Sequence, residues 1–160
     1  MIKTFDNHFE KVGDDLKNIL RDSNLYVSAN KFSIYGYKAL KKELNKIKNM
    51  KFIFSTPLFL DDTNKNRKIF AISKKSISAT EFEIDLKNKM DNSYIAKECK
   101  SWIEKKAQFK AVKGNFAITN MIITENETSY ALYLGIDEFS SAGFGYKKDN
   151  SILKPITKKP

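Results

Sequence analysis

Residues 25–57 read LYVSANKFSIYGYKALKKELNKIKNMKFIFSTP, and this stretch decides the fold. Leu25–Ala29 is rich in strand formers, and Met50–Pro57 has the pattern of a buried strand that ends at a proline. Between them, apolar residues recur at helical spacing, at Tyr37, Leu40, Leu44 and Ile47. A strand, a helix and a strand within about 30 residues is the length that a crossover between parallel strands needs. The sequence therefore predicts a mixed α/β fold whose sheet is at least partly parallel and flanked by helices.

Further helices are expected on either side of this unit. Upstream, the spacing of the apolar residues predicts an amphipathic helix over His8–Leu20, with Asp6 or Asn7 as its cap. Its apolar face consists of Phe9, Val12, Leu16, Ile19 and Leu20. Downstream, a second helical face carries Ile95, Cys99, Trp102 and Ile103, and a strand is expected at Gln108–Val112.

A hairpin is expected near the end of the chain. Residues 114–145 read GNFAITNMIITENETSYALYLGIDEFSSAGFG, in which a polar turn joins two apolar runs and a Ser/Gly-rich loop follows the second. The rest of the sequence offers few groups that catalyse reactions, so the prediction of an activity depends on this hairpin.

Length and composition indicate one domain. The chain has 160 residues, of which 41% are hydrophobic and 12% aromatic, an ordinary globular composition that is long enough to bury a sizeable core. We expect the domain to span residues 1–146. Residues 58–93 mix short apolar runs with polar clusters and are interpreted as an insertion, and the lysine-rich residues 147–160 as a basic tail or linker.

The chain is basic, with 29 Lys+Arg against 19 Asp+Glu and a net charge of +10. This charge indicates an anionic partner such as nucleic acid. Only Arg21 and Arg67 are arginines, however, and the abundance of Lys, Asn and Ile is also typical of an AT-rich genome. Because arginine is the residue that reads bases, its scarcity favours contacts with the nucleic-acid backbone, without sequence preference.

Few residues suggest other chemistry. Cys99, the single cysteine, is expected to be a buried structural thiol, and His8, the single histidine, a solvated or capping residue. The sequence has no Walker loop, no Gly-x-Gly-x-x-Gly and no Gly-x-Ser-x-Gly motif, so no cofactor is expected. It also has no long apolar run and no leader-like start, which predicts a cytoplasmic protein without a membrane partner.

The order of the predicted elements resembles the phospholipase D superfamily, in particular the divergent single-copy domains that precede Swi/Snf-type helicases in bacterial defence systems. The resemblance covers most of the chain and is carried by four stretches, Leu25–Leu44, Met50–Phe59, Ala96–Asn115 and Tyr130–Tyr146. It implies a phospholipase D-like single domain. Because relatives pair two copies of their motif, often across a two-fold axis, the resemblance also allows a homodimer.

The resemblance also implies that the active site is degenerate. Active relatives carry a His-x-Lys pair on the first strand of the hairpin and an asparagine in the loop after the second, and the histidine attacks phosphorus. The loop Gly135–Phe144 keeps the Gly, Phe-Ser and Gly-Phe features, but Ile118 stands at the histidine position, Asn120 at the lysine and Glu138 at the asparagine. Isoleucine is no nucleophile, and a carboxylate at Glu138 repels a phosphate. The resemblance thus predicts an inactive module, with no catalytic residue.

Three acidic groups offer a metal-dependent alternative. They are Asp61–Asp62, the set Glu81, Glu83 and Asp85 with Lys87, and the pair Asp137–Glu138. In the second group the charges alternate with Phe82, Ile84 and Leu86, a pattern that is also typical of a solvated strand face.

The candidate nucleic-acid contacts are lysines. The densest segment is 31–51, with Lys31, Lys38, Lys41, Lys42, Lys46, Lys48 and Lys51 against Glu43 alone, and the tail adds Lys147, Lys148, Lys154, Lys158 and Lys159. A solvated helix surface is the plain alternative for the first group. Tyr26, Tyr35 and Tyr37 are candidates for stacking on bases or for packing in the core.

Three function classes remain open. The first is an inactive phospholipase D-like module that binds nucleic acid within a defence helicase or nuclease system. The second is a small regulator that binds a defence protein, including a phage-encoded inhibitor, and the third is a metal-dependent nuclease that uses Glu83 and Asp85 or Asp137 and Glu138.

Overall fold

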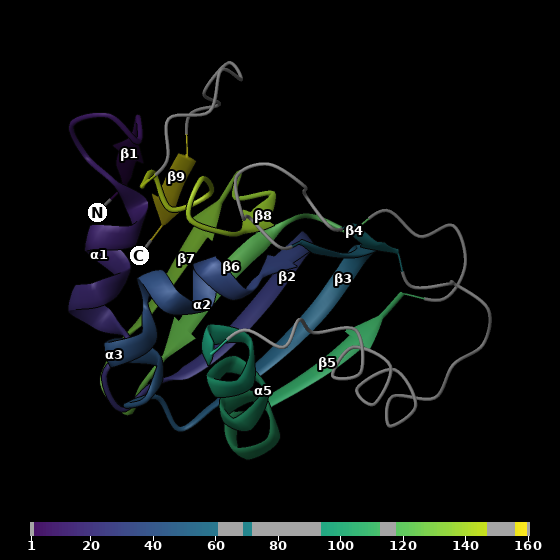
Figure 1. Cartoon of the computed structure of the whole chain (residues 1–160). Coiled ribbons are helices and arrows are strands. Elements are labelled where there is room, and N and C mark those ends of the chain that lie inside the picture. The colour runs from purple at the N-terminus through teal and green to yellow at the C-terminus, as the bar shows by residue number, and fades with distance from the viewer. Residues whose placement is uncertain (1, 61–68, 72–93, 113–117, 147–155, 160) are drawn as a thin grey trace.

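The computed structural model describes residues 2–60, 69–71, 94–112, 118–146 and 156–159 (Figure 1). The helices are α1 (Val12–Ile19), α2 (Ile34–Ala39), α3 (Lys41–Leu44) and α5 (Tyr94–Lys106). The strands are β1 (Lys3–Phe5), β2 (Asn24–Ser33), β3 (Asn49–Leu60), β4 (Ile69–Ala71), β5 (Ala107–Ala111), β6 (Met121–Glu125), β7 (Tyr130–Leu134), β8 (Glu138–Phe139) and β9 (Ile156–Lys159).

In the described residues, the strands form one nine-stranded sheet of order β1-β9-β7-β6-β2-β3-β4, in which β5 also pairs with β3 and β8 with β2. The pairs β2–β3, β3–β5 and β2–β8 are parallel, and the remaining pairs are antiparallel. This confirms the predicted mixed sheet and the predicted crossover from β2 to β3. The expected hairpin is also present, as β6 and β7.

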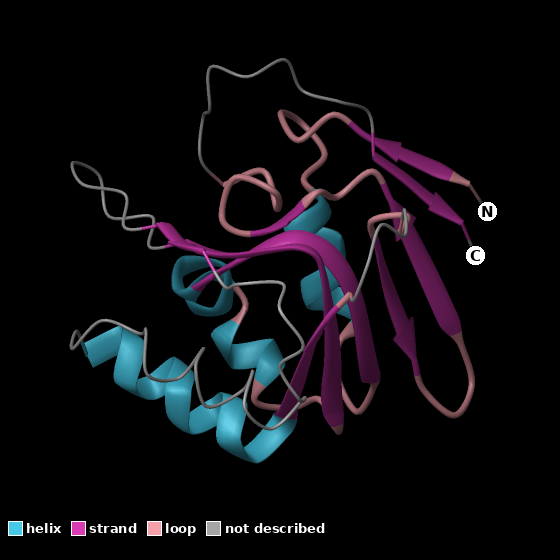
Figure 2. Cartoon of the chain, turned by 90° about the vertical axis from the view of Figure 1, so that its right-hand side faces the viewer, coloured by secondary structure: helices cyan, strands magenta, loops and turns pink. Residues whose placement is uncertain are grey.

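The described helices lie on one face of the sheet, as Figures 1 and 2 show from two sides. Side chains alternate across the sheet, so that Phe52 and Phe54 are buried under the helices while Ile53 between them is 39% exposed. The helical side carries the core. Among the described helices, none combines the length and the apolar character that crossing a lipid bilayer requires.

A cluster of aromatic rings joins the parallel strands. Phe32 at the end of β2 stacks on Phe139 of β8 with ring centroids 5.3 Å apart, and its edge meets Phe109 of β5 at 5.1 Å. Such pairs stabilise a core beyond the burial of their area. The short strand β8 is therefore anchored to the centre of the sheet.

The predicted helix over His8–Leu20 is shorter in the structure. It begins at Val12, and residues 6–10 form a turn in which Phe9 is 93% exposed, so its expected place in the core is wrong. The physical cause is Asp6, whose side chain accepts hydrogen bonds from the backbone N–H groups of three turn residues. Of the two predicted caps, Asp6 thus holds the turn, whereas the Asn7 side chain accepts the backbone N–H of Val12, the first residue of α1.

The helix between β2 and β3 is interrupted at Leu40, which separates α2 from α3. The four residues of its predicted apolar face are nevertheless all buried, including Ile47, which follows α3. Tyr37, offered as a base-stacking or core residue, is a core residue at 2% exposure.

Pro57 does not end the strand, contrary to the prediction. β3 continues to Leu60, because the register with β2 shifts between Ala29, which pairs with Phe54, and Lys31, which pairs with Leu58. Pro57 falls within this irregularity, where the regular ladder is interrupted and a missing N–H is tolerated.

Both segments expected to be peripheral contribute strands. In the predicted insertion, residues 58–60 form the end of β3 and pair with residues 69–71, which make up β4. In the predicted tail, residues 156–159 form β9, which lies between β1 and β7. The remainder of both segments lies outside the described residues.

Candidate functional site

The topology brings several chain segments to one edge of the sheet. Because β6 is antiparallel to both β2 and β7, and β9 is antiparallel to both β7 and β1, the strands β1, β2 and β7 run in the same direction. β3, β5 and β8 join them through parallel pairing. The ends of these strands define what we call the carboxyl edge. The Asp6–Glu10 turn after β1, the loop after β7 and the residues before β6 all lie there.

Four polar side chains meet at this edge and are called the edge cluster: Asn30, Ser55, Asn120 and Asp137. The Asn120 amide donates to Asp137 Oδ1 at 3.0 Å, and Ser55 Oγ lies 2.9 Å from Asn120 Oδ1 and within hydrogen-bond distance of Asn30 Oδ1. The backbone N–H of Asn30 donates to the Asp137 carbonyl at 2.8 Å. These contacts tie β2, β3 and the residues before β6 to the loop that precedes β8.

An ion pair lies next to the edge cluster. Lys31 Nζ donates to Glu138 Oε1 at 3.1 Å, and Ser140 Oγ donates to Glu138 Oε2 at 3.1 Å. Ser140 Oγ in turn accepts the backbone N–H of Gly143 at 3.0 Å. Glu138 is therefore held on both oxygens, and Lys31, a predicted nucleic-acid contact, is partly neutralised.

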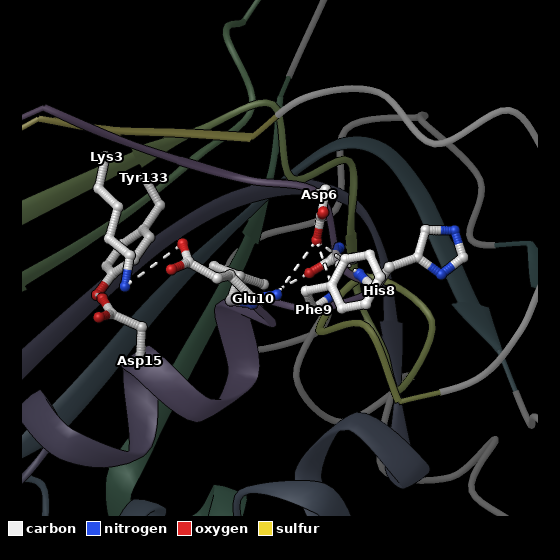
Figure 3. Close-up of polar contacts among 9 residues, drawn as sticks. Lys3, Asp6, His8, Phe9, Glu10, Asp15 and Tyr133 are labelled. Atoms are coloured by element: carbon white, nitrogen blue, oxygen red, sulfur yellow. Dashed lines mark hydrogen bonds and ion pairs between the residues drawn. The ribbon is translucent and has the colours of Figure 1, made fainter.

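The three positions that the resemblance marks are now placed. Asn120 belongs to the edge cluster and Glu138 to the ion pair, and Ile118 is half-buried. Ile118 and Asn120 precede β6, which begins at Met121, so they do not lie within the first hairpin strand as predicted. His8 lies in the exposed Asp6–Glu10 turn, on a different segment of the same edge (Figure 3).

The predicted metal candidates are only partly described. Asp61, Asp62, Glu81, Glu83, Asp85 and Lys87 lie outside the described residues. Within the described part of the chain, His, Cys, Asp and Glu side chains form no group of three that suits a metal ion. Of the pair Asp137–Glu138, the first accepts from Asn120 and the second from Lys31 and Ser140.

The predicted lysine contacts differ in their surroundings. Lys38 in α2 and Lys42 in α3 are exposed, whereas Lys41 Nζ donates to both carboxylate oxygens of Glu98 in α5 at 2.7 Å. The hydrogen bond from Lys41 lowers the pKa of the Glu98 carboxyl below its ordinary value. Lys147 and Lys148 lie outside the described residues.

The cysteine is buried, and the two remaining aromatic candidates are partly buried. Cys99 is buried in α5, and burial raises the pKa of its thiol, which disfavours a nucleophilic thiolate. Tyr35 is half-buried, and Tyr26 donates from its hydroxyl to Glu125 at 3.3 Å.

Sequence reasoning did not single out Asn30 and Ser55. The only sequence signal for them is that each is a polar residue at the end of a predicted strand. Their meeting depends on parallel pairing of β2 and β3, which brings residues 25 positions apart into contact.

Comparisons with known proteins give a fold but no family. No protein-family model matches the chain, and no curated protein matches it. Among solved structures, yeast tyrosyl-DNA phosphodiesterase is similar at a TM-score of 0.50 and 13% identity, over 100% of this chain and 31% of that one. A mutant form of the yeast enzyme gives 0.48 and 12% over 99% of this chain. The chain thus spans under a third of the length of the structures it matches. At this identity the likeness shows the fold alone: the chain has a phospholipase D-like α/β fold.

Proposed function

We propose that this chain is a catalytically inactive phospholipase D-like module that binds nucleic acid through its phosphates, without sequence preference. The observation that carries the proposal is the Asn120 amide of the edge cluster, which is bound to Asp137 at the position where the resemblance expects a lysine, while Ile118 stands where it expects the histidine. Phosphoryl transfer through a covalent phosphohistidine needs a histidine at this place, and the surroundings offer a carboxylate instead.

The electrostatics of the edge support the same conclusion. Lys31 is a cation next to the edge cluster, and its ammonium is paired with the Glu138 carboxylate at 3.1 Å. Asp137 and Glu138 add two carboxylates against this one ammonium, so a phosphate here gains little attraction. Phosphate binding is better supported on the helical side of the molecule, where Lys38 and Lys42 are exposed and Lys41 is not available.

The net charge of +10 and the fold favour nucleic acid as the ligand. One solved protein with a similar fold is, by its name, a tyrosyl-DNA phosphodiesterase. The sequence resemblance adds the setting of the proposal, a bacterial defence helicase or nuclease system, in which a protein of that system is the other partner.

Fluorescence anisotropy with labelled single- and double-stranded DNA tests the binding. The wild-type chain is expected to bind both, more weakly as salt is raised, and the Lys38→Ala/Lys42→Ala variant to bind several-fold more weakly. The matched control is Lys51→Ala/Lys110→Ala, which removes the same charge from exposed positions that alternate with the buried Phe52 and Phe109 and so lie on the opposite face of the sheet. Equal effects of the two variants contradict a defined binding surface.

Incubating the same DNA with magnesium and running it on a denaturing gel tests the inactivity. The proposal expects intact DNA. His8→Ala is the decisive control, because His8 is the only histidine of the chain and lies at the carboxyl edge. Cleavage that disappears in His8→Ala overturns the proposed inactivity, and cleavage that depends on magnesium but not on His8 favours the metal-dependent nuclease.

A further inference from the structure

Phe9 is the most exposed large apolar side chain of the described residues, at 93% of its surface. It lies in the Asp6–Glu10 turn between β1 and α1, at the carboxyl edge (Figure 3). A ring that projects into water at a loop gains nothing for the fold, since burial of apolar surface is what stabilises a core. This raises the question of what the ring contacts.

The turn that carries Phe9 is rigidly held. Asp6 Oδ1 accepts the backbone N–H groups of His8, Phe9 and Glu10 at 2.8, 3.0 and 3.2 Å. The backbone N–H of Asn7 donates to the Glu10 carbonyl at 3.1 Å. These backbone hydrogen bonds lower the pKa of the Asp6 carboxyl below its ordinary value and so favour the charged form that holds the turn.

Asn7 anchors the turn to the body of the domain. It has a φ of +58°, a conformation that asparagine tolerates better than most residues, and its Oδ1 accepts the backbone N–H of Val12 at 3.0 Å. Its Nδ2 donates to the Gly143 carbonyl at 3.4 Å, in the loop that follows β8. The ring of Phe9 thus projects from a fixed backbone. A ligand that binds to it therefore causes little further loss of conformational entropy in the loop.

The surroundings of Phe9 are polar and close to neutral. Asp6, His8 and Glu10 are all exposed, and Glu10 lies 3.6 Å from Lys3 in an ion pair (Figure 3). Lys11 follows, with its Nζ 5.7 Å from the ring centroid of Tyr146. A protein interface needs a contiguous apolar core, which this turn lacks. One isolated ring in a neutral surrounding suits the flat, uncharged face of a single base, while phosphates are held elsewhere.

We propose that Phe9 is a stacking platform for an unpaired base of single-stranded nucleic acid at the carboxyl edge, with the exposed imidazole of His8 beside it. The inference rests on the proposed function and specifies the ligand as single-stranded or frayed nucleic acid. An unpaired base is required because bases within a duplex are already stacked on their neighbours and do not offer a free face.

The test measures anisotropy with a labelled single strand and a blunt duplex for the wild type, Phe9→Ala, Phe9→Trp and Tyr130→Ala. Phe9→Ala is expected to bind the single strand about 5- to 100-fold more weakly, the usual range for one base-stacking ring, and to bind the duplex as before. Phe9→Trp should retain affinity, and its new indole should be quenched on binding. The existing Trp102 is 4% exposed and should contribute a constant signal.

Tyr130→Ala is the matched control. Tyr130 is 66% exposed and begins β7, so it lies at the opposite edge of the sheet, and its removal should leave both affinities unchanged. If the wild type binds the single strand and Phe9→Ala binds it equally well, the stacking inference is overturned while the proposed function stands. A protein pocket as the true partner of Phe9 gives this same result. If the wild type binds no nucleic acid, both proposals fail.

Discussion

Lys31 and Glu138 form an ion pair whose side chains are 30% and 31% exposed. Partial exposure leaves the pair open to screening, so we expect a coupling free energy of about 0.5–1 kcal/mol, decreasing at high salt. A double-mutant cycle with Lys31→Met and Glu138→Gln, followed by urea unfolding, measures it; glutamine keeps an oxygen that accepts from Ser140. A coupling of zero at low salt is inconsistent with the pair in solution.

Tyr37 provides a prediction for alkaline pH. Burial, followed by the nearby Cys99 and Glu98, raises the pKa of its hydroxyl to about 12, from 10.0. Because the pKa of the folded state is the higher one, the neutral phenol stabilises the fold fully below the unfolded value, and this stabilisation is lost as the pH rises from 10.0 to about 12. The alkaline loss of stability should be smaller in Tyr37→Phe. An equal loss in both proteins means that Tyr37 is not responsible.

The positions of single residues in the structure show what the sequence alone can predict. Apolar spacing correctly placed Tyr37, Leu40 and Leu44 in the core, since it depends only on neighbours along the chain. It misplaced Phe9, because a single carboxylate, Asp6, binds three backbone N–H groups and competes with the helix. The Lys41–Glu98 contact joins residues 57 positions apart, and local spacing does not reveal it.

Among the elements, α2 is pressed against the loop that follows β8. A Cβ atom on Gly36 would lie 2.5 Å from the Phe139 carbonyl oxygen and 2.8 Å from Ser140 Cα, both backbone atoms. Gly36→Ala should therefore destabilise the fold by about 1–3 kcal/mol, despite the higher helix propensity of alanine. Urea unfolding measures this change. The control is Lys38→Ala at an exposed position of the same helix, whose free energy of unfolding should stay within about 0.5 kcal/mol of the wild type. A Gly36→Ala protein of unchanged or higher stability contradicts the close packing.

The strand β9 yields a second prediction at this scale. Because β9 pairs with β1 through three residues and with β7 through three, a chain that ends at residue 155 leaves β1 without its described partner and β7 paired with β6 alone. We expect the truncated chain to melt at least about 3 °C lower, which corresponds to roughly 1 kcal/mol for a domain of this size. Thermal unfolding followed by circular dichroism measures the difference. Identical melting would show that residues 156–160 behave as a tail, as the sequence suggested.

Element boundaries depend on pairing that the sequence does not reveal. The crossover, the parallel strands and the hairpin were predictable, because apolar periodicity and turn residues indicate each of them within short segments of sequence. The extension of β3 past Pro57 depends on the irregular register with β2, and the strand character of residues 156–159 depends on β1 and β7. The edge cluster likewise appears only when β2 and β3 are aligned in parallel.

At the scale of the whole molecule, one face of the sheet is covered by helices and one edge gathers the polar groups and the Phe9 turn. We propose that Lys38 and Lys42 on the helical side bind phosphates and that Phe9 at the carboxyl edge stacks on a base. Under both proposals the phospholipase D-like fold serves as a scaffold for binding.

The most direct test of this account is the salt dependence of binding to a labelled single strand. The slope of log affinity against log salt counts the phosphate contacts, at about 0.7 per contact for single strands. Lys38→Ala/Lys42→Ala should reduce the slope by roughly 1.4 relative to the wild type, whereas Lys51→Ala/Lys110→Ala, with the same loss of charge, should leave it unchanged. Equal slopes for all three proteins, or no binding by the wild type, would contradict a phosphate-binding surface on α2 and α3.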